Sequence, residues 1–63
     1  MKVIKTSTAV IPIESIFYAR IPIYDTKSVE IHLKGGAVVV ARHSTTEQAQ
    51  NHLKSIYEEM AAE

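Results

Sequence analysis

The residues from Val29 to Glu47 read VEIHLKGGAVVVARHSTTE, and this stretch decides the fold. Residues 29–34 alternate apolar and polar side chains, the pattern of a strand with one buried face. Residues 37–42 are rich in valine, and the two glycines before them are typical of a tight hairpin turn. The remaining residues have the composition of a helix start. We therefore predict an antiparallel hairpin that runs directly into a helix.

The turn also predicts how the two strands pair. A two-residue loop made of Gly35 and Gly36 places Leu33 opposite Val38 and His32 opposite Val39. In this register the inner face carries Ile31, Leu33, Val38 and Val40. Val39 then lies on the outer face, where a monomer would place a polar residue. We therefore expect Val39 to belong to an interface.

The helix has its own signals. Ser44 and Glu47 have the spacing of a capping box, in which the two side chains bond to each other's backbone N–H groups. The apolar residues that follow recur with helical period: Ala49, Leu53, Ile56 and Met60. The apolar stripe is single and narrow, which indicates that the helix covers one face of the sheet.

The first half of the chain predicts two more strands. Residues 2–11 are rich in β-branched side chains. In the next strand we expect Ile16, Tyr18 and Arg20 on one face, opposite Phe17. The predicted fold class is α+β: an antiparallel three- to four-stranded β-meander with one C-terminal α-helix packed on one face. It forms a single domain, 1–63, with strands at about 2–11, 16–23, 29–34 and 37–42 and a helix at about 45–61.

The length of 63 residues limits the core that one copy can build. Such a small domain is marginal alone, and small proteins compensate with disulfides, metals or oligomerisation. The chain has no cysteine, whereas its apolar content is 46%. We therefore expect a homo-oligomer, most simply a dimer. The predicted interface residues are Phe17, Ile21, Ile23, His32 and Val39.

Residues that could carry catalysis are not grouped by the sequence. The three histidines, at 32, 43 and 52, are not at ligand spacing for a metal. The carboxylates show no pairing of the kind that general acid–base catalysis needs. We predict no catalytic residue, no metal and no cofactor. The chain is then a small non-enzymatic interaction or regulatory protein that binds a protein partner in the cytoplasm. No apolar run reaches the ~20 residues of a membrane span.

Nucleic-acid binding is the alternative function. Four basic residues are the candidate phosphate contacts: Arg20, Lys27, Lys34 and Arg42. However, seven basic and seven acidic residues leave a formal net charge of zero. Strong non-specific binding to nucleic acid draws on a basic surplus that displaces counterions. The charge balance therefore favours a protein partner.

Three segments resemble the opening of LytTR-type DNA-binding domains. They are Ile13-Glu14-Ser15-Ile16-Phe17-Tyr18, residues 29–36, and Ala41-Arg42-His43-Ser44. That family has an Ile-x-x-Ile-x-Tyr strand, a strand that ends in a glycine turn, and a following helix. The resemblance covers about residues 11–53, and the family's later Arg-x-His-Arg segment, which contacts DNA, is absent here. It implies a β-meander with a helix and, as the alternative function, a transcriptional regulator.

Overall fold

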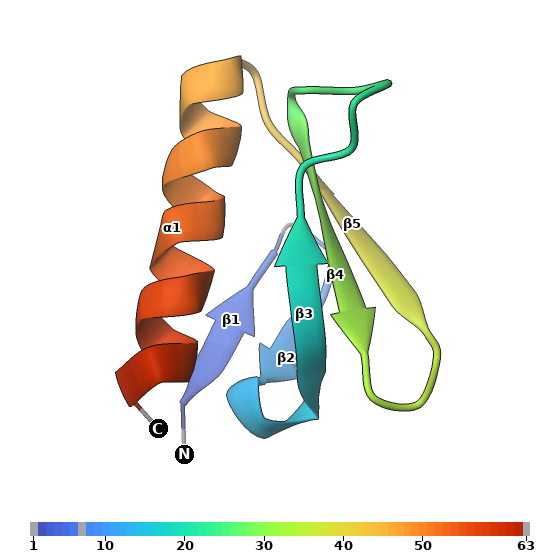
Figure 1. The fold of residues 1–63 in the computed structure, drawn as a ribbon, viewed down its shortest axis with the longest axis vertical. Helices are drawn as coiled ribbons and strands as arrows, with labels where there is room; N and C mark the ends of the chain where they lie inside the picture. The colour runs from blue at the N-terminus through green and yellow to red at the C-terminus, as the bar shows by residue number, and fades with distance from the viewer. Residues whose placement is uncertain (1, 7, 63) are drawn as a thin grey trace.

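The computed structural model describes residues 2–6 and 8–62. Three strands, β3 (Ile16–Arg20), β4 (Ser28–Leu33) and β5 (Val38–Arg42), form an antiparallel sheet in that order. A separate two-stranded sheet joins β1 (Val3–Lys5) to β2 (Val10–Pro12), and a 3-10 helix, η1 (Ile13–Ser15), leads into β3. The helix α1 (Thr46–Ala62) packs on one face of the larger sheet (Figure 1). The predicted α+β class is confirmed.

The expected strand over residues 2–11 is instead a hairpin. Strands β1 and β2 pair antiparallel, with Ile4 opposite Ile11. The chain reverses between them because the hydroxyl of Thr6 accepts hydrogen bonds from the backbone N–H groups of Thr8 and Ala9. Threonine is a good strand former, but its hydroxyl also supports turns. The prediction of one continuous strand here was wrong for that reason.

Strand β3 contains a bulge that changes which side chains share a face. The pairing with β4 shifts between Ile16 and Tyr18. As a result Phe17 and Tyr18 are both exposed, whereas Ile16 and Ala19 are both buried. A bulge adds one residue and so breaks the strict alternation of a strand. The expectation that Ile16 would share a face with Tyr18 and Arg20 is therefore wrong. The strand also ends at Arg20, short of the expected residue 23.

The hairpin between β4 and β5 has a register one residue away from the expected one. Ile31 lies opposite Val39, and His32 lies opposite Val38. The Gly36 N–H donates to the Leu33 carbonyl at 3.0 Å, and the Leu33 N–H donates to the Ala37 carbonyl at 2.8 Å. The loop therefore has three residues, of which Gly36 adopts a positive φ of 94°. Glycine pairs fit this three-residue loop as well as the two-residue one.

This shift reverses the two faces of β5, because side chains alternate with every residue of a strand. Val39 and Ala41 point to the face that α1 covers, which we call the inner face. Val38 and Val40 point to the opposite, outer face and are 48% and 45% exposed. The prediction that Val39 lies on the outer face was wrong, and Val38 and Val40 take its place.

The core lies between the inner face, α1 and the β1–β2 hairpin. The predicted helix stripe is confirmed, since Ala49 and Ile56 are fully buried and Leu53 and Met60 pack against them. The helix cap sits one residue later than expected. Thr45 accepts from the Gln48 N–H, and the Gln48 side chain accepts from the Ser44 N–H, each at 3.1 Å. In the described ranges no helix is both long and apolar enough to span a membrane.

Candidate interaction surface

The outer face of the larger sheet carries two rows of side chains that cross all three strands. The strand pairing aligns Tyr18 with His32 and Val38 in one row. It aligns Arg20 with Glu30 and Val40 in the next row. Among residues 2–6 and 8–62 no helix covers this face, because α1 packs on the other one (Figure 1). The outer face is therefore the part of the sheet that another molecule can reach.

Glu30 is the organising residue of the second row. Its Oε1 accepts from Arg20 Nε at 2.9 Å and contacts His32 Nε2 at 3.3 Å. Its Oε2 accepts from the hydroxyl of Tyr24. These contacts leave only 8% of the Glu30 side chain exposed. The hydrogen bonds from Tyr24 and then from Arg20 lower the pKa of Glu30 to about 2. The carboxylate is therefore charged at neutral pH, and both of its oxygens are already engaged by neighbouring side chains.

The ion pair hides the negative charge and leaves the positive one accessible. The Arg20 side chain is 58% exposed, although its Nε is bound to Glu30. Hydrogen bonding and attraction to Glu30 raise the pKa of Arg20 and keep it cationic. More than half of the Arg20 side chain therefore remains accessible to another molecule. The face thus presents a fixed guanidinium group, which is suited to carboxylates.

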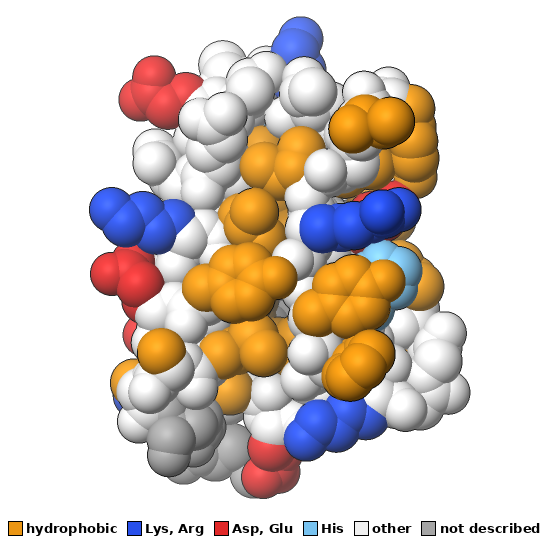
Figure 2. Space-filling view, in the orientation of Figure 1, with side chains coloured by type: hydrophobic (Ala, Val, Ile, Leu, Met, Phe, Trp, Pro, Cys, Tyr) orange, Lys and Arg blue, Asp and Glu red, His pale blue; other side chains and the backbone are white. Residues whose placement is uncertain are grey.

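Aromatic rings form a platform beside this guanidinium group. The rings of Tyr18 and His32 stack with centroids 4.3 Å apart and an angle of 8° between their planes. Phe17 meets Tyr18 edge-on at 5.4 Å, and 65% of Phe17 is exposed. Figure 2 shows apolar side chains over β3 with basic side chains above and below them. Apolar surface of this kind, rimmed by polar groups, is typical of interaction sites.

The loop that joins β3 to β4 extends this surface. Ile23 is 98% exposed and Tyr24 is 78% exposed, although the Tyr24 hydroxyl is bound to Glu30. The Asp25 N–H donates to the Pro22 carbonyl at 3.2 Å, which closes the turn. A large aliphatic side chain held in water by an ordered turn is costly. Contact with another molecule would remove that cost.

The predicted interface residues divide into two groups. Phe17, Ile23 and His32 lie on or beside the outer face. Ile21 and Val39 pack against the core instead. The sequence interpretation missed Tyr24, Glu30, Val38 and Val40. The first two are joined by a contact that no spacing rule indicates, and the valines were placed on the wrong face by the register.

The four candidate phosphate contacts do not form one patch. Lys34 is in the hairpin loop, at the opposite end of the sheet from Arg42, which pairs with Ser28. Lys27 precedes Ser28, which pairs with Arg42, and Asp25 is close enough to both basic residues to interact with their charges. The pKa of Asp25 is lowered first by hydrogen bonds from the Ser28 hydroxyl and the Lys27 N–H, and further by the charges of Arg42 and Lys27. Acidic groups therefore accompany the basic residues at this end.

Two histidines that are nine positions apart in the sequence meet in space. His43 Nε2 lies 2.8 Å from His52 Nδ1, and the rings meet nearly at right angles. His43 follows β5, and its N–H donates to the Lys27 carbonyl, while His52 is on α1. The pair links the sheet to the helix. No group of three or more metal-binding side chains occurs among the described residues.

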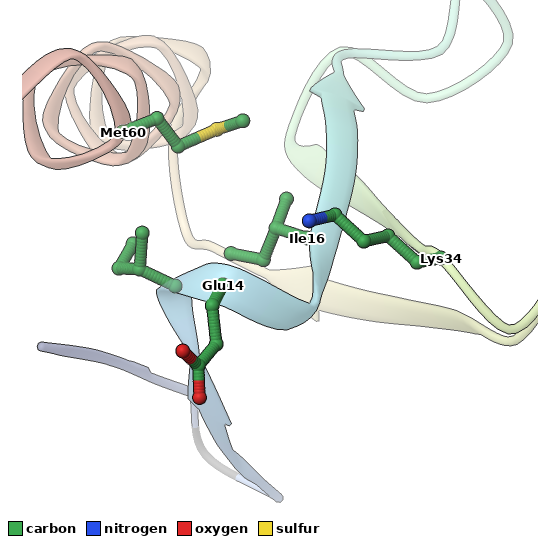
Figure 3. Close-up of a pocket in the computed structure, with 5 residues that line it drawn as sticks. Glu14, Ile16, Lys34 and Met60 are labelled. Atoms are coloured by element: carbon green, nitrogen blue, oxygen red, sulfur yellow. The ribbon is translucent and has the colours of Figure 1, made fainter. Parts of the chain in front are cut away.

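A shallow cavity of about 300 Å³ lies between η1, the hairpin loop and the end of α1. Its lining consists of Ile13, Glu14, Ile16, Lys34 and Met60. In Figure 3 the Lys34 side chain reaches toward Ile16, while the Glu14 carboxylate points away from the Lys34 ammonium group. This volume is at the small end for ligand sites, and its two charged groups do not converge. The outer face is the stronger candidate.

Comparison with protein family models, with curated proteins and with solved structures finds no match to this chain. The resemblance to LytTR-type domains is thus limited to the segments quoted above.

Proposed function

We propose that the protein is a small self-associating interaction protein, and that the outer face binds a protein partner. The observation that carries the proposal is the arrangement around Glu30. A saturated carboxylate is buried beneath Arg20 and Tyr24, next to the stacked rings of Tyr18 and His32. Ordered aromatic and arginine side chains contribute most to binding in protein interfaces.

Self-association is supported by the size of the core. Four of the ten buried apolar residues are alanine or valine, so one copy buries a modest apolar volume. The total accessible surface is 4253 Å². A standard interface removes about 800 Å² from each partner, which is about a fifth of this surface. Oligomerisation of that extent is a common way to stabilise so small a chain.

The chemistry of the outer face defines the partner. The accessible charge at the centre of this face is Arg20, since the Glu30 carboxylate is buried, whereas Arg42 at the end of the face has Asp25 nearby. The apolar contribution comes from Phe17, Val38 and Val40. A complementary partner therefore presents apolar side chains together with Asp or Glu residues. Such a partner gains both apolar burial and a charge-assisted hydrogen bond with Arg20.

A non-enzymatic role fits the state of the ionisable groups on this face. A general base works best when its pKa is near the working pH. The pKa of Glu30 is about 2, and its oxygens are already bound to three side chains. The Ser28 hydroxyl donates to Asp25 and is nearly completely buried. These groups serve to hold the surface in shape.

Nucleic-acid binding is a second candidate because of one observation. The stacked pair of Tyr18 and His32, with Phe17 beside it, offers ring faces on an antiparallel sheet, and unpaired bases stack on such platforms. This candidate is weakened because the basic residues lie at different ends of the sheet and because the acidic Asp25 is close to Lys27 and Arg42. Binding to a single-stranded oligonucleotide that falls steeply with salt would favour this candidate over the protein partner.

Peptide selection tests the proposed surface. A displayed library of random peptides is selected on the immobilised full chain and then compared on two variants. We expect the enriched peptides to combine acidic and apolar residues and to lose most binding to Phe17→Ser and Arg20→Gln. The control is Lys54→Ala, since Lys54 is exposed on α1. Equal binding to all variants would place the surface elsewhere, and a monomer in sedimentation at micromolar concentration would contradict self-association.

A further inference from the structure

The two edges of the larger sheet differ. At the β3 edge, the bulge interrupts the strand, and the hydroxyl of Tyr57 from α1 donates to the Ala19 carbonyl. Both features prevent another strand from pairing there. β5 forms the other edge and lies on the side of the sheet away from α1 (Figure 1). One edge is thus closed by the fold itself, and the other is open.

The pairing pattern identifies the open backbone groups of β5. The Leu33 N–H donates to the Ala37 carbonyl, and the His43 N–H donates to the Lys27 carbonyl. In an antiparallel pair the residues that bond to a given neighbour alternate along the strand. The odd-numbered residues of β5 therefore bond to β4. The backbone N–H and C=O groups of Val38, Val40 and Arg42 point away from the sheet, and within the described ranges β4 is the only strand beside β5.

The sequence of β5 does not protect this edge. Exposed edge strands are usually blunted by proline, lysine, a bulge or a covering element. Strand β5 reads VVVAR, has regular pairing with β4 and contains neither proline nor lysine, and its one charged residue, Arg42, stands at its very end. Valine has high β-propensity, so the strand is well suited to pair again. An open edge of this composition is suited to pair with another strand.

We propose that β5 pairs antiparallel with β5 of a second copy, about a two-fold axis at Val40. This inference rests on the self-association proposed above and specifies its geometry. The two three-stranded sheets become one continuous sheet. Val40 lies opposite the partner's Val40, and Val38 lies opposite the partner's Arg42. This two-fold arrangement uses the same strand on both copies and therefore closes as a dimer.

The register follows from the open groups and from charge. A two-fold pairing centred on Val40 uses all three open residues of each β5 strand, which allows about six backbone hydrogen bonds. It also keeps the two Arg42 side chains at opposite ends of the strand pair. A register moved toward the end of β5 would bring the two arginines together, and like charges directly opposite each other destabilise a sheet. The pairing centred on Val40 is thus the favoured one.

The dimer also enlarges the proposed binding surface. Val38 and Val40 lie on the outer face at the edge of the sheet, so pairing through β5 joins the outer faces of both copies. Each copy contributes its own Arg20–Glu30 pair to this continuous surface. A partner with two acidic segments could then contact both guanidinium groups.

Cysteine cross-linking tests the register, because the natural chain has no cysteine. Val40→Cys places two cysteines in a hydrogen-bonded pair with Cα atoms about 5.5 Å apart, which suits a disulfide. Val38→Cys is the matched control on the same face. Its two copies are separated by four residues along the strand, about 13 Å, which is too far for a disulfide. We expect a covalent dimer of the first variant only, under mild oxidation.

A backbone variant tests the edge itself. Proline is tolerated where a strand's N–H points away from the sheet, so each copy of Val40→Pro should still fold. It removes one hydrogen-bond donor from each copy, and we expect the dimer dissociation constant to rise roughly tenfold or more. Val40→Thr keeps the N–H and is the control, with a dissociation constant close to that of the natural chain. Circular dichroism checks that both variants fold.

The outcomes separate this inference from the proposal on which it rests. Dimers of the natural chain without cross-linking of Val40→Cys would overturn the β5 pairing and leave self-association intact. Equal cross-linking of Val38→Cys would overturn the register. A natural chain that sediments as a monomer throughout the micromolar range would overturn both proposals.

Discussion

The imidazole rings of His43 and His52 hydrogen-bond to each other, with His43 Nε2 2.8 Å from His52 Nδ1. One ring donates and the other accepts, so the contact requires at least one neutral histidine. Burial, followed by the neighbouring His43, lowers the pKa of His52 below its ordinary 6.5. Because the pair links the end of β5 to α1, its protonation acts on the packing of the helix.

The first prediction concerns stability between neutral and mildly acidic pH. The lowered pKa of His52 means that the folded state binds fewer protons than the unfolded chain at and below pH 6.5. The free energy of unfolding should therefore be greatest above pH 6.5 and fall as the pH decreases toward the folded pKa. Urea unfolding at pH 7.5 and 5.5 measures this change. His52→Gln should reduce it, whereas Lys54→Ala, at an exposed position of α1, should not, and equal slopes would contradict the role of the pair.

A second pH effect is expected at Glu30 in a different range. The pKa of Glu30 falls from 4.5 to about 2 on folding. This carboxylate therefore stabilises the fold above about pH 4.5, and the stabilisation is lost as the pH decreases from there toward 2. Melting curves between pH 5 and pH 2.5 should show a smaller decrease for Glu30→Gln. Gln50→Ala, at an exposed position of α1, is the control and should follow the natural chain.

The fold class was predictable because the patterns that define it are local. The apolar spacing from Ala49 to Met60 predicts a helix with one buried stripe, and the alternation in β4 predicts its buried face. The register of β5 was less predictable, since two glycines fit loops of two or three residues. That single difference moved Val39 from the outer face to the inner one. A difference of one residue in the loop length therefore decides on which face of the sheet each side chain of the strand lies.

The candidate surface was predictable only in part. Exposed aromatic residues such as Phe17 can be proposed from an excess of apolar positions, and this residue is indeed exposed. The contacts of Glu30 with Arg20 and Tyr24 depend on the strand pairing and on the path of a loop. The meeting of His43 and His52 depends on how α1 lies across the sheet. Such contacts come from tertiary structure and have no signature in the spacing of residues.

The third prediction tests the three-residue loop. Gly36 has a φ of 94°, which side chains resist, so Gly36→Ala should destabilise the fold by about 1–2 kcal/mol. Gly35→Ala is the matched control, because its added Cβ meets no atom within 4 Å and its φ is not positive. That change should be neutral or slightly stabilising. Thermal unfolding of both variants decides the matter, and equal losses at the two positions would favour the two-residue loop.

The fourth prediction concerns the core. Ile56 lies on the face of α1 that packs on the sheet and is completely buried, so Ile56→Ala should lower the free energy of unfolding by about 2–5 kcal/mol. Lys54→Ala on the exposed side of the same helix should change it by less than about 0.5 kcal/mol. Denaturant unfolding compares them. A loss below 1 kcal/mol for Ile56→Ala would mean that the helix packs less tightly on the sheet than the structure shows.

The last prediction concerns the closed edge of β3. The Tyr57 hydroxyl binds the Ala19 carbonyl at that edge, and Tyr57→Ala removes both the bond and the ring. The β3 edge then keeps only its bulge as an obstacle to pairing, so it can add to the open β5 edge, and contacts between unlike edges do not close. We expect light scattering to show species larger than a dimer. Ile56→Ala controls for aggregation by unfolding, because it weakens the core and keeps Tyr57. The double variant with Val40→Pro should return to small species, since growth needs both edges. If Tyr57→Ala sediments like the natural chain, the bulge alone closes the β3 edge.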